Sequence, residues 1–285
     1  MNNKRMGDVL NMTVNQVILT EEDKNKFKRD GYWISPKLID DETIARLRDA
    51  IDRVFAGDYD GDGYLPFSQP ISLDTSKPLV RVSNGWWVND EVRAVVTSHT
   101  LGEIAAQLIE TDEVRLWHDQ LIYKQGNENK VSDGNVGWHQ DYAYWQCSST
   151  SNMVTAWIAL QDTDLTNGGM MTILGSHTWG LIPESTGFRN QNMEELKQKF
   201  SSGHEWVEEP CILKAGQASF HHSLTFHGSG PNTTPNPRYS VVAHLMPKEA
   251  TFRNIQPHGN EAFLGPRPVN GQKFENQFFP LLYRK

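Results

Sequence analysis

The chain has 285 residues and a formal net charge of −8 at pH 7. An acidic chain without a run of Lys or Arg has no surface that would attract phosphate backbones or anionic lipids, so nucleic-acid and membrane partners are disfavoured. Aromatic residues make up 10% and charged residues 22% of the chain, which is typical of a globular protein and excludes a disordered or fibrous one. A small molecule is therefore the expected partner.

The two cysteines and the first residues of the chain indicate the cellular compartment in which the protein is expected. Cys147 and Cys211 are too few for a disulfide framework and lack the paired spacing of a zinc site, which favours a reducing environment. Residues 1–16 are polar, and no stretch reaches the roughly 18 apolar residues of a membrane span. We expect a cytoplasmic protein whose residues 1–18 form a flexible tail.

Two helices are expected before residue 60. The first begins after Thr20, where acidic residues occupy the first turn, and ends at Gly31 before the β-prone residues 32–34. The second is capped by Asp40 or Asp41, and its apolar residues recur at helical spacing: Ile44, Leu47, Ile51, Val54 and Phe55. This stripe predicts packing against a flat surface, expected to be a sheet.

From about residue 79 onwards, short β-prone runs are interrupted by Gly, Asn, Asp and Pro, which indicates a sandwich or barrel. Loops are expected around 56–78 and 124–136. A helical run at 193–200 lies within an insertion, 183–206, expected to form a lid over a site. Strands are expected near residues 79–82, 114–124, 136–142, 153–162, 170–174, 208–213, 217–221 and 237–246.

The segment Trp138-His139-Gln140-Asp141-Tyr142 is the first candidate for chemistry. On a strand, residues i and i+2 point to the same face, so the side chains of His139 and Asp141 would converge on one point. A His-x-Asp triplet is common by chance, and a hydrogen-bonded His and Asp without a metal is the alternative.

A third candidate ligand, His227, lies 88 residues further on, where a strand is expected to end before Gly228-Ser229-Gly230-Pro231-Asn232. Two imidazoles and one carboxylate form the facial triad of non-haem Fe(II) oxygenases, whereas a structural zinc site would require four ligands, mostly Cys and His. His221 and His222 are followed by no such turn, so we expect them to pack near the site.

Arg238 follows His227 by eleven residues, and strand alternation places it on one face with Ser240 and Val242. A buried guanidinium requires an anionic partner and suits a carboxylate, which it binds with two hydrogen bonds. A metal beside a carboxylate receptor predicts a co-substrate that carries a carboxylate. An Arg that reaches solvent at a strand end is the alternative.

These motifs resemble the phytanoyl-CoA dioxygenase (PhyH) family. The resemblance rests on His139-Gln140-Asp141, on Asn167-Gly168-Gly169 leading into Gly175-Ser176-His177, and on the segment from His227 to Asn232 followed by Arg238. In order and spacing it covers roughly residues 114–246, and Leu174 departs from the family, which usually has Pro there. It implies one domain over residues 1–285, mainly β with flanking helices, around a double-stranded β-helix of the jelly-roll or cupin type.

The resemblance also implies the cofactors. Fe(II) is expected to be bound by His139, Asp141 and His227, and 2-oxoglutarate to chelate it while O2 takes the remaining position. Arg238 is expected to bind the distal carboxylate of 2-oxoglutarate. The co-substrate contacts implied by family position are Arg238, Ser229 and Trp157 and, by a looser match, Gln120 and Arg81, for which a strand-lining amide and a surface cation are the alternatives.

The implied reaction is hydroxylation or another oxidation of a C–H bond, with release of succinate and CO2. Family halogenases replace the carboxylate ligand by a small residue, and Asp141 is present here. Desaturating, demethylating or halogenating variants and a non-catalytic β-helix binding protein remain as alternatives. No basic patch suggests an acyl-CoA, so a small metabolite or natural product is expected, in a pocket to which these residues are candidates: Tyr142, Tyr144, Trp145, His118 and His244.

Overall fold

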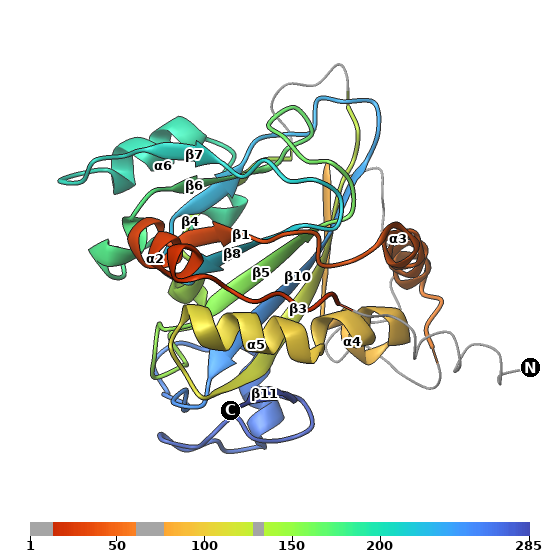
Figure 1. The fold of residues 1–285 in the computed structure, drawn as a ribbon. Coiled ribbons are helices and arrows are strands. Elements are labelled where there is room, and N and C mark those ends of the chain that lie inside the picture. Colours follow the sequence, from red (N-terminus) through yellow and green to blue (C-terminus); the bar gives the residue numbers. More distant parts are fainter. Residues whose placement is uncertain (1–13, 61–76, 128–133) are drawn as a thin grey trace, which may run out of the picture.

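The computed structural model describes residues 14–60, 77–127 and 134–285, and within them two β-sheets enclose the site (Figure 1). The larger sheet has the order β1-β8-β5-β10-β3-β11, with β2 paired to β3, and the smaller sheet has the order β4-β9-β6-β7. This is the predicted double-stranded β-helix. The strands are β1 Tyr32–Ile34, β2 Leu79–Ser83, β3 Glu113–Lys124, β4 Val136–His139, β5 Val154–Ala159, β6 Met170–Ile173, β7 Glu208–Pro210, β8 Ala218–His222, β9 His227–Ser229, β10 Arg238–Pro247 and β11 Leu281–Arg284.

The two N-terminal helices form where the sequence predicts them. Helix α2 (Glu21–Asp30) has a capping box in which Thr20 and Asp23 bind each other's backbone N–H, and Gly31 ends it in the left-handed conformation at φ +80°. Helix α3 (Asp41–Ala56) begins at Asp40, whose carboxylate accepts a hydrogen bond from the backbone N–H of Thr43 at 2.7 Å.

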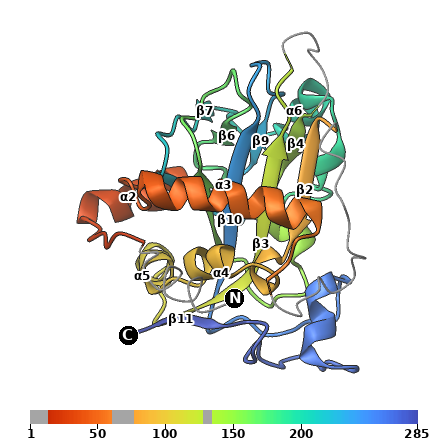
Figure 2. The same cartoon turned by 90° about the vertical axis from the view of Figure 1, so that its right-hand side faces the viewer.

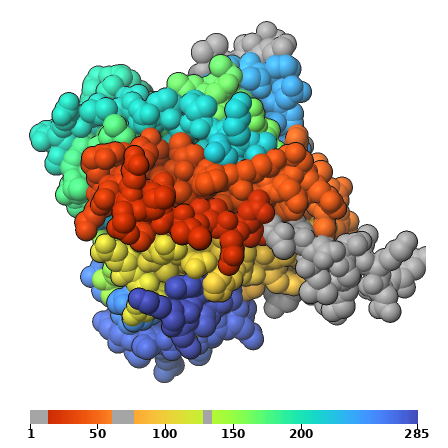
Figure 3. Space-filling view, in the orientation of Figure 1, coloured from red at the N-terminus to blue at the C-terminus, as the bar shows by residue number. Residues whose placement is uncertain are grey.

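Helix α3 crosses the outer face of the larger sheet, as Figure 2 shows, and its buried apolar stripe joins the main hydrophobic core. The Tyr239 hydroxyl of β10 donates to Asp52 of α3 at 2.9 Å. Two further helices, α4 (Asp90–Val96) and α5 (His99–Leu108), complete this layer and were not predicted. In Figure 3 residues 14–60, red to orange, form a continuous band over this face.

Successive side chains of β10 point alternately into the hydrophobic core and towards the site. Val241, Ala243 and Leu245 pack into the core beneath the helices, whereas Val242 belongs to a separate cluster with Trp157 on the other side. The residues in phase with Val242 are polar and buried: Arg238, Ser240 and His244. A sheet that buries apolar residues on one face and polar ones on the other provides a scaffold and a binding surface at once.

Some predicted boundaries are wrong. The strand expected at 136–142 ends at His139, and Asp141 begins a 3-10 helix, Asp141–Tyr144, after an extended Gln140 at φ −108° and ψ 131°. The chain turns here because the Gln140 side chain is held by the carbonyls of Gly180 and Leu224 at 2.9 and 2.7 Å. The strand expected at 208–213 is only the three-residue β7, and β11 was not predicted.

Most of the predicted tail, residues 1–13, lies outside the described residues, as do much of the loops expected at 56–78 and 124–136. The described part of the tail is held against the domain. Val14 is buried, and the backbone N–H of Asn15 donates to the carbonyl of Leu38 at 2.7 Å. None of the helices in the described ranges is long and apolar enough to cross a membrane.

Candidate metal centre and co-substrate pocket

Two adjacent strands of the smaller sheet bring the predicted metal ligands together. His139 at the end of β4 is the direct partner of His227 at the start of β9, and their ring centroids lie 4.1 Å apart. Asp141 Oδ1 lies 3.7 Å from Nε2 of each histidine. In the described part of the chain, no other group of three His, Cys, Asp or Glu donors converges in this way.

Backbone carbonyls fix the orientation of both imidazoles. His139 Nδ1 lies 2.8 Å from the carbonyl of Gly137, and His227 Nδ1 lies 3.0 Å from the carbonyl of Thr225. A carbonyl only accepts, so each Nδ1 carries the proton and each Nε2 presents its lone pair towards the Asp141 carboxylate. This arrangement is typical of metal-binding histidines, whose second nitrogen is anchored by the protein.

The carboxylate is held just as firmly. The Thr155 hydroxyl donates to Asp141 Oδ2 at 2.7 Å, and His221 Nε2 lies 3.4 Å from the same oxygen. Burial alone would raise the pKa of Asp141, but interactions with His227, His139 and His221 outweigh it and hold the pKa well below its usual value. The site thus offers an anionic oxygen and two imidazole nitrogens, a donor set that suits Fe(II).

Thr155→Val tests the support of this carboxylate. The substitution keeps the shape of the side chain but removes the hydroxyl that fixes Asp141, and loss of such outer contacts typically weakens metal affinity about 10- to 100-fold. We expect that loss in an anaerobic Fe(II) titration. Thr163→Val is the matched control, because the buried Thr163 donates to the carbonyl of Gln161 at 3.0 Å, beyond the end of β5. Equal Fe(II) affinity in both variants would contradict the prediction.

A small cavity between the sheets adjoins the metal ligands, and Arg238 lines it. Its guanidinium is buried and lies 5.0 Å from the centroid of the Trp157 ring. It donates to Ser240 Oγ at 3.3 Å, while its Nε has no partner and no carboxylate among the described residues pairs with it. Burial lowers the pKa of Arg238 to about 9. An uncompensated buried cation of this kind is a receptor for an anion.

A buried lysine that supports a residue of this cavity was missed from the sequence. Lys124, at the end of β3, is fully buried, and its Nζ donates to the carbonyl of Gly230 and to Ser229 Oγ, the latter at 2.6 Å. Burial and the nearby Arg238 lower the pKa of Lys124 well below its usual value. Because Ser229 accepts from Lys124, its own hydrogen is available for a ligand in the cavity. The sequence contains one indication of its position. Lys124 lies four residues after Gln120 on one strand, and side chains at even spacing point to the same face of a strand.

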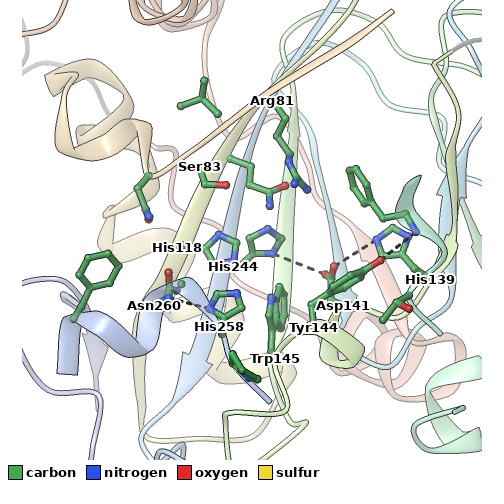
Figure 4. A pocket seen from close by; sticks show the side chains of 18 of the residues that line it. Arg81, Ser83, His118, His139, Asp141, Tyr144, Trp145, His244, His258 and Asn260 are labelled. Atoms are coloured by element: carbon green, nitrogen blue, oxygen red, sulfur yellow. Dashed lines mark hydrogen bonds and ion pairs between the residues drawn. The ribbon is translucent and has the colours of Figure 1, made fainter. Parts of the chain in front are cut away.

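The other predicted residues divide between this cavity and a larger one of about 850 Å³ (Figure 4). Ser229 and Trp157 line the small cavity, Gln120 lines both, and Arg81 lines only the larger one. The larger cavity opens onto His139 and Asp141, so a molecule bound in it would lie beside the metal ligands. Its predicted wall is confirmed for these residues: Tyr144, Trp145, His118 and His244.

Of three further aromatic residues near the site, His221 lines the small cavity, whereas Tyr142 and His222 line neither. Tyr142 does not line either cavity, because its ring packs in an apolar cluster and its hydroxyl donates to the carbonyl of Ser148 at 2.8 Å. His221 packs against Asp141, as expected of a residue near the site. His222 lies beside His177, with ring centroids 5.6 Å apart, and lines neither cavity.

The fold and the convergent His-x-Asp and His side chains define the class of non-haem iron oxygenases built on a double-stranded β-helix. A family model described as Phytanoyl-CoA dioxygenase (PhyH) matches residues 27–240, most of the chain. The chain belongs to this family.

Individual relatives agree with that assignment. An ectoine dioxygenase of Streptomyces avermitilis is 26% identical over 271 residues, which cover 87% of this chain and 83% of the relative. Among solved structures, a non-heme alpha ketoglutarate dependent carbocyclase, SnoK from nogalamycin biosynthesis, shares the fold with a TM-score of 0.71 at 21% identity, over 93% of this chain and 96% of its own. The epimerase SnoN, solved with Fe3+, alpha ketoglutarate and nogalamycin RO, has a TM-score of 0.68 at 24% identity and covers 92% of this chain and 98% of its own.

Proposed function

We propose that this protein is an Fe(II)- and 2-oxoglutarate-dependent oxygenase that oxidises a C–H bond of a small metabolite or natural product, with release of succinate and CO2. The observation that carries the proposal is the placement of three metal donors between two cavities, one with a buried, unpaired Arg238 and one of about 850 Å³. Family membership and relatives named as dioxygenases support the same reaction class.

In this proposal His139, Asp141 and His227 hold Fe(II) on one face. When bound, the iron supplies the activation of O2 and the oxidising power that no protein side chain has. The chain binds 2-oxoglutarate through Arg238, with Ser229 as a hydrogen-bond donor and Trp157 and Gln120 as walls of the small cavity. Arg81, the fifth predicted contact, lies on the wall of the larger cavity instead.

The larger cavity is the proposed substrate site. Thr186, Phe188 and Arg189 line it, and all three belong to the 183–206 insertion predicted as a lid. The substrate would thus be enclosed between this segment and the inner face of the larger sheet, which excludes water from the metal ligands. Cys147 and Cys211 are both free and buried, which suits the proposed cytoplasmic location.

Succinate release tests the function directly. The protein is incubated with Fe(II), O2 and 2-oxoglutarate against a metabolite library, and we expect one substrate class to stimulate succinate formation and to gain one oxygen by mass spectrometry. The His139→Ala variant serves as the inactive control. Loss of two hydrogens, or gain of chlorine, would identify the desaturating or halogenating alternative. Substrate binding without succinate formation would identify a non-catalytic binding protein.

A further inference from the structure

Two arginines from different parts of the chain line the larger cavity. Arg81 comes from β2 and Arg189 from the end of the 3-10 helix Gly187–Arg189 in the insertion. The guanidinium of Arg81 lies 4.5 Å from the centroid of the Phe188 ring. Neither arginine forms an ion pair within the described residues. Among the described residues that line the cavity, the one acidic side chain is Asp141, and it belongs to the metal centre.

The positive charges of Arg81 and Arg189 repel each other. Surrounding protein atoms and the charge of Arg189 both lower the pKa of Arg81. Both side chains remain accessible to water within the hollow, so the cations are presented to whatever fills it. Two guanidiniums facing one cavity repel each other until an anion lies between them, and a planar guanidinium suits a carboxylate or a phosphate.

We infer that the substrate carries a carboxylate or phosphate group that is bound jointly by Arg81 and Arg189. This inference rests on the proposed function and names the chemical class of its substrate. It reassigns Arg81 from the co-substrate, because the small cavity with Arg238 is lined by other residues. The anionic group would then be held on the side of the cavity formed by β2 and the insertion, with the rest of the substrate extending along the neighbouring strands β3 and β10 of the same sheet.

The part of the cavity wall formed by β3 and β10, next to β2, carries polar but uncharged side chains. His118 is buried and neither ring nitrogen has a hydrogen-bond partner, and His244 uses Nδ1 for Thr155 while its Nε2 has none. Figure 4 shows these two imidazoles beside each other, with His258 and Asn260 further along the same wall. Buried polar atoms without a partner are costly unless a ligand satisfies them. The rings of His118 and His244 therefore give the cavity a polar, uncharged wall beside the two arginines.

Binding of three small probes tests the anion site without turnover. Phenylacetate and phenyl phosphate carry the two proposed anions, and phenylacetamide has nearly the shape of phenylacetate without the charge. Dissociation constants are measured by NMR under anaerobic conditions, once with the protein alone and once with Ni(II) and saturating 2-oxoglutarate, so that Arg238 is occupied in the second series. We expect wild type to prefer at least one of the anions over the amide by about tenfold or more in both series.

Variants assign that preference to the arginine pair. In Arg81→Gln/Arg189→Gln the preference should fall to about one, whereas Arg81→Lys/Arg189→Lys should retain part of it. Arg267→Gln is the control. It removes one positive charge from an exposed position that does not line the cavity, and it should behave as wild type.

Two binding results would overturn the inference: equal binding of all probes by wild type, or an unchanged preference for the anion in the double Gln variant. A third would be a tenfold loss of 2-oxoglutarate affinity in Arg81→Gln, which would show that Arg81 binds the co-substrate. The assay needs neither iron nor O2. A charge-dependent preference without succinate formation by any substrate would therefore refute the proposed function alone, and the converse would refute the inference alone.

Discussion

Replacement of His139, Asp141 or His227 by Ala is expected to abolish Fe(II) binding and all iron-dependent activity. Loss of an outer contact to a metal ligand typically costs 10- to 100-fold in affinity, so loss of a ligand itself should cost more than about 100-fold. The measurement is an anaerobic Fe(II) titration together with succinate formation.

The same variants should keep the fold. His139 and His227 lie on strands whose pairing is made by the backbone, and Asp141 begins the 3-10 helix that follows the first of these strands. Thermal unfolding followed by circular dichroism should therefore show a cooperative transition in every variant. His222→Ala is the matched control, because His222 lies on β8 near the site but lines neither cavity. Loss of iron in His222→Ala with retention in His227→Ala would show that the third ligand is misassigned.

The sequence identifies the three convergent side chains because each stands in a local motif. His139 and Asp141 are separated by one residue, and His227 precedes a Gly- and Pro-rich turn that is followed by Arg238 at the spacing of the resembled family. The structure adds what no local pattern contains, namely that β4 and β9 pair with His139 opposite His227. The strand argument for Asp141 reached the right side chain although the strand itself ends two residues earlier, because Gln140 stays extended before the 3-10 turn.

Features that depend on distant contacts were missed. Lys124 looks like an ordinary strand-end cation, and its role follows only from its burial against Ser229 and Gly230, more than 100 residues away. Helices α4 and α5 were overlooked among the β-prone runs. Arg189 stood in a segment predicted only as a lid, and its relation to Arg81 arises because the 3-10 helix Gly187–Arg189 folds back beside β4 at the edge of the cavity.

Substitution of Arg238 should act on 2-oxoglutarate and leave iron affinity nearly unchanged. Removal of one member of a buried charge pair costs about 3–5 kcal/mol, much of it because the partner carboxylate is left unpaired. At about 1.4 kcal/mol per factor of ten, Arg238→Ala should weaken 2-oxoglutarate binding by roughly two to three orders of magnitude. Ser229, which lines the cavity and accepts a hydrogen bond from Lys124, leaves a second polar group near the carboxylate, which places the expected loss towards the lower end of that range.

Arg238→Lys should recover only part of the loss. A lysine presents a point charge and can neither form the planar two-bond contact with a carboxylate nor stack its head group on the Trp157 ring, 5.0 Å from the Arg238 guanidinium. The measurement is an anaerobic titration of the Fe(II)·2-oxoglutarate charge-transfer band in wild type and both variants. Arg284→Ala is the control, since Arg284, on the edge strand β11, pairs with Glu113 of β3 outside both cavities. Equal 2-oxoglutarate affinity in wild type, Arg238→Ala and Arg238→Lys would remove Arg238 from the site and leave the small cavity without its carboxylate receptor.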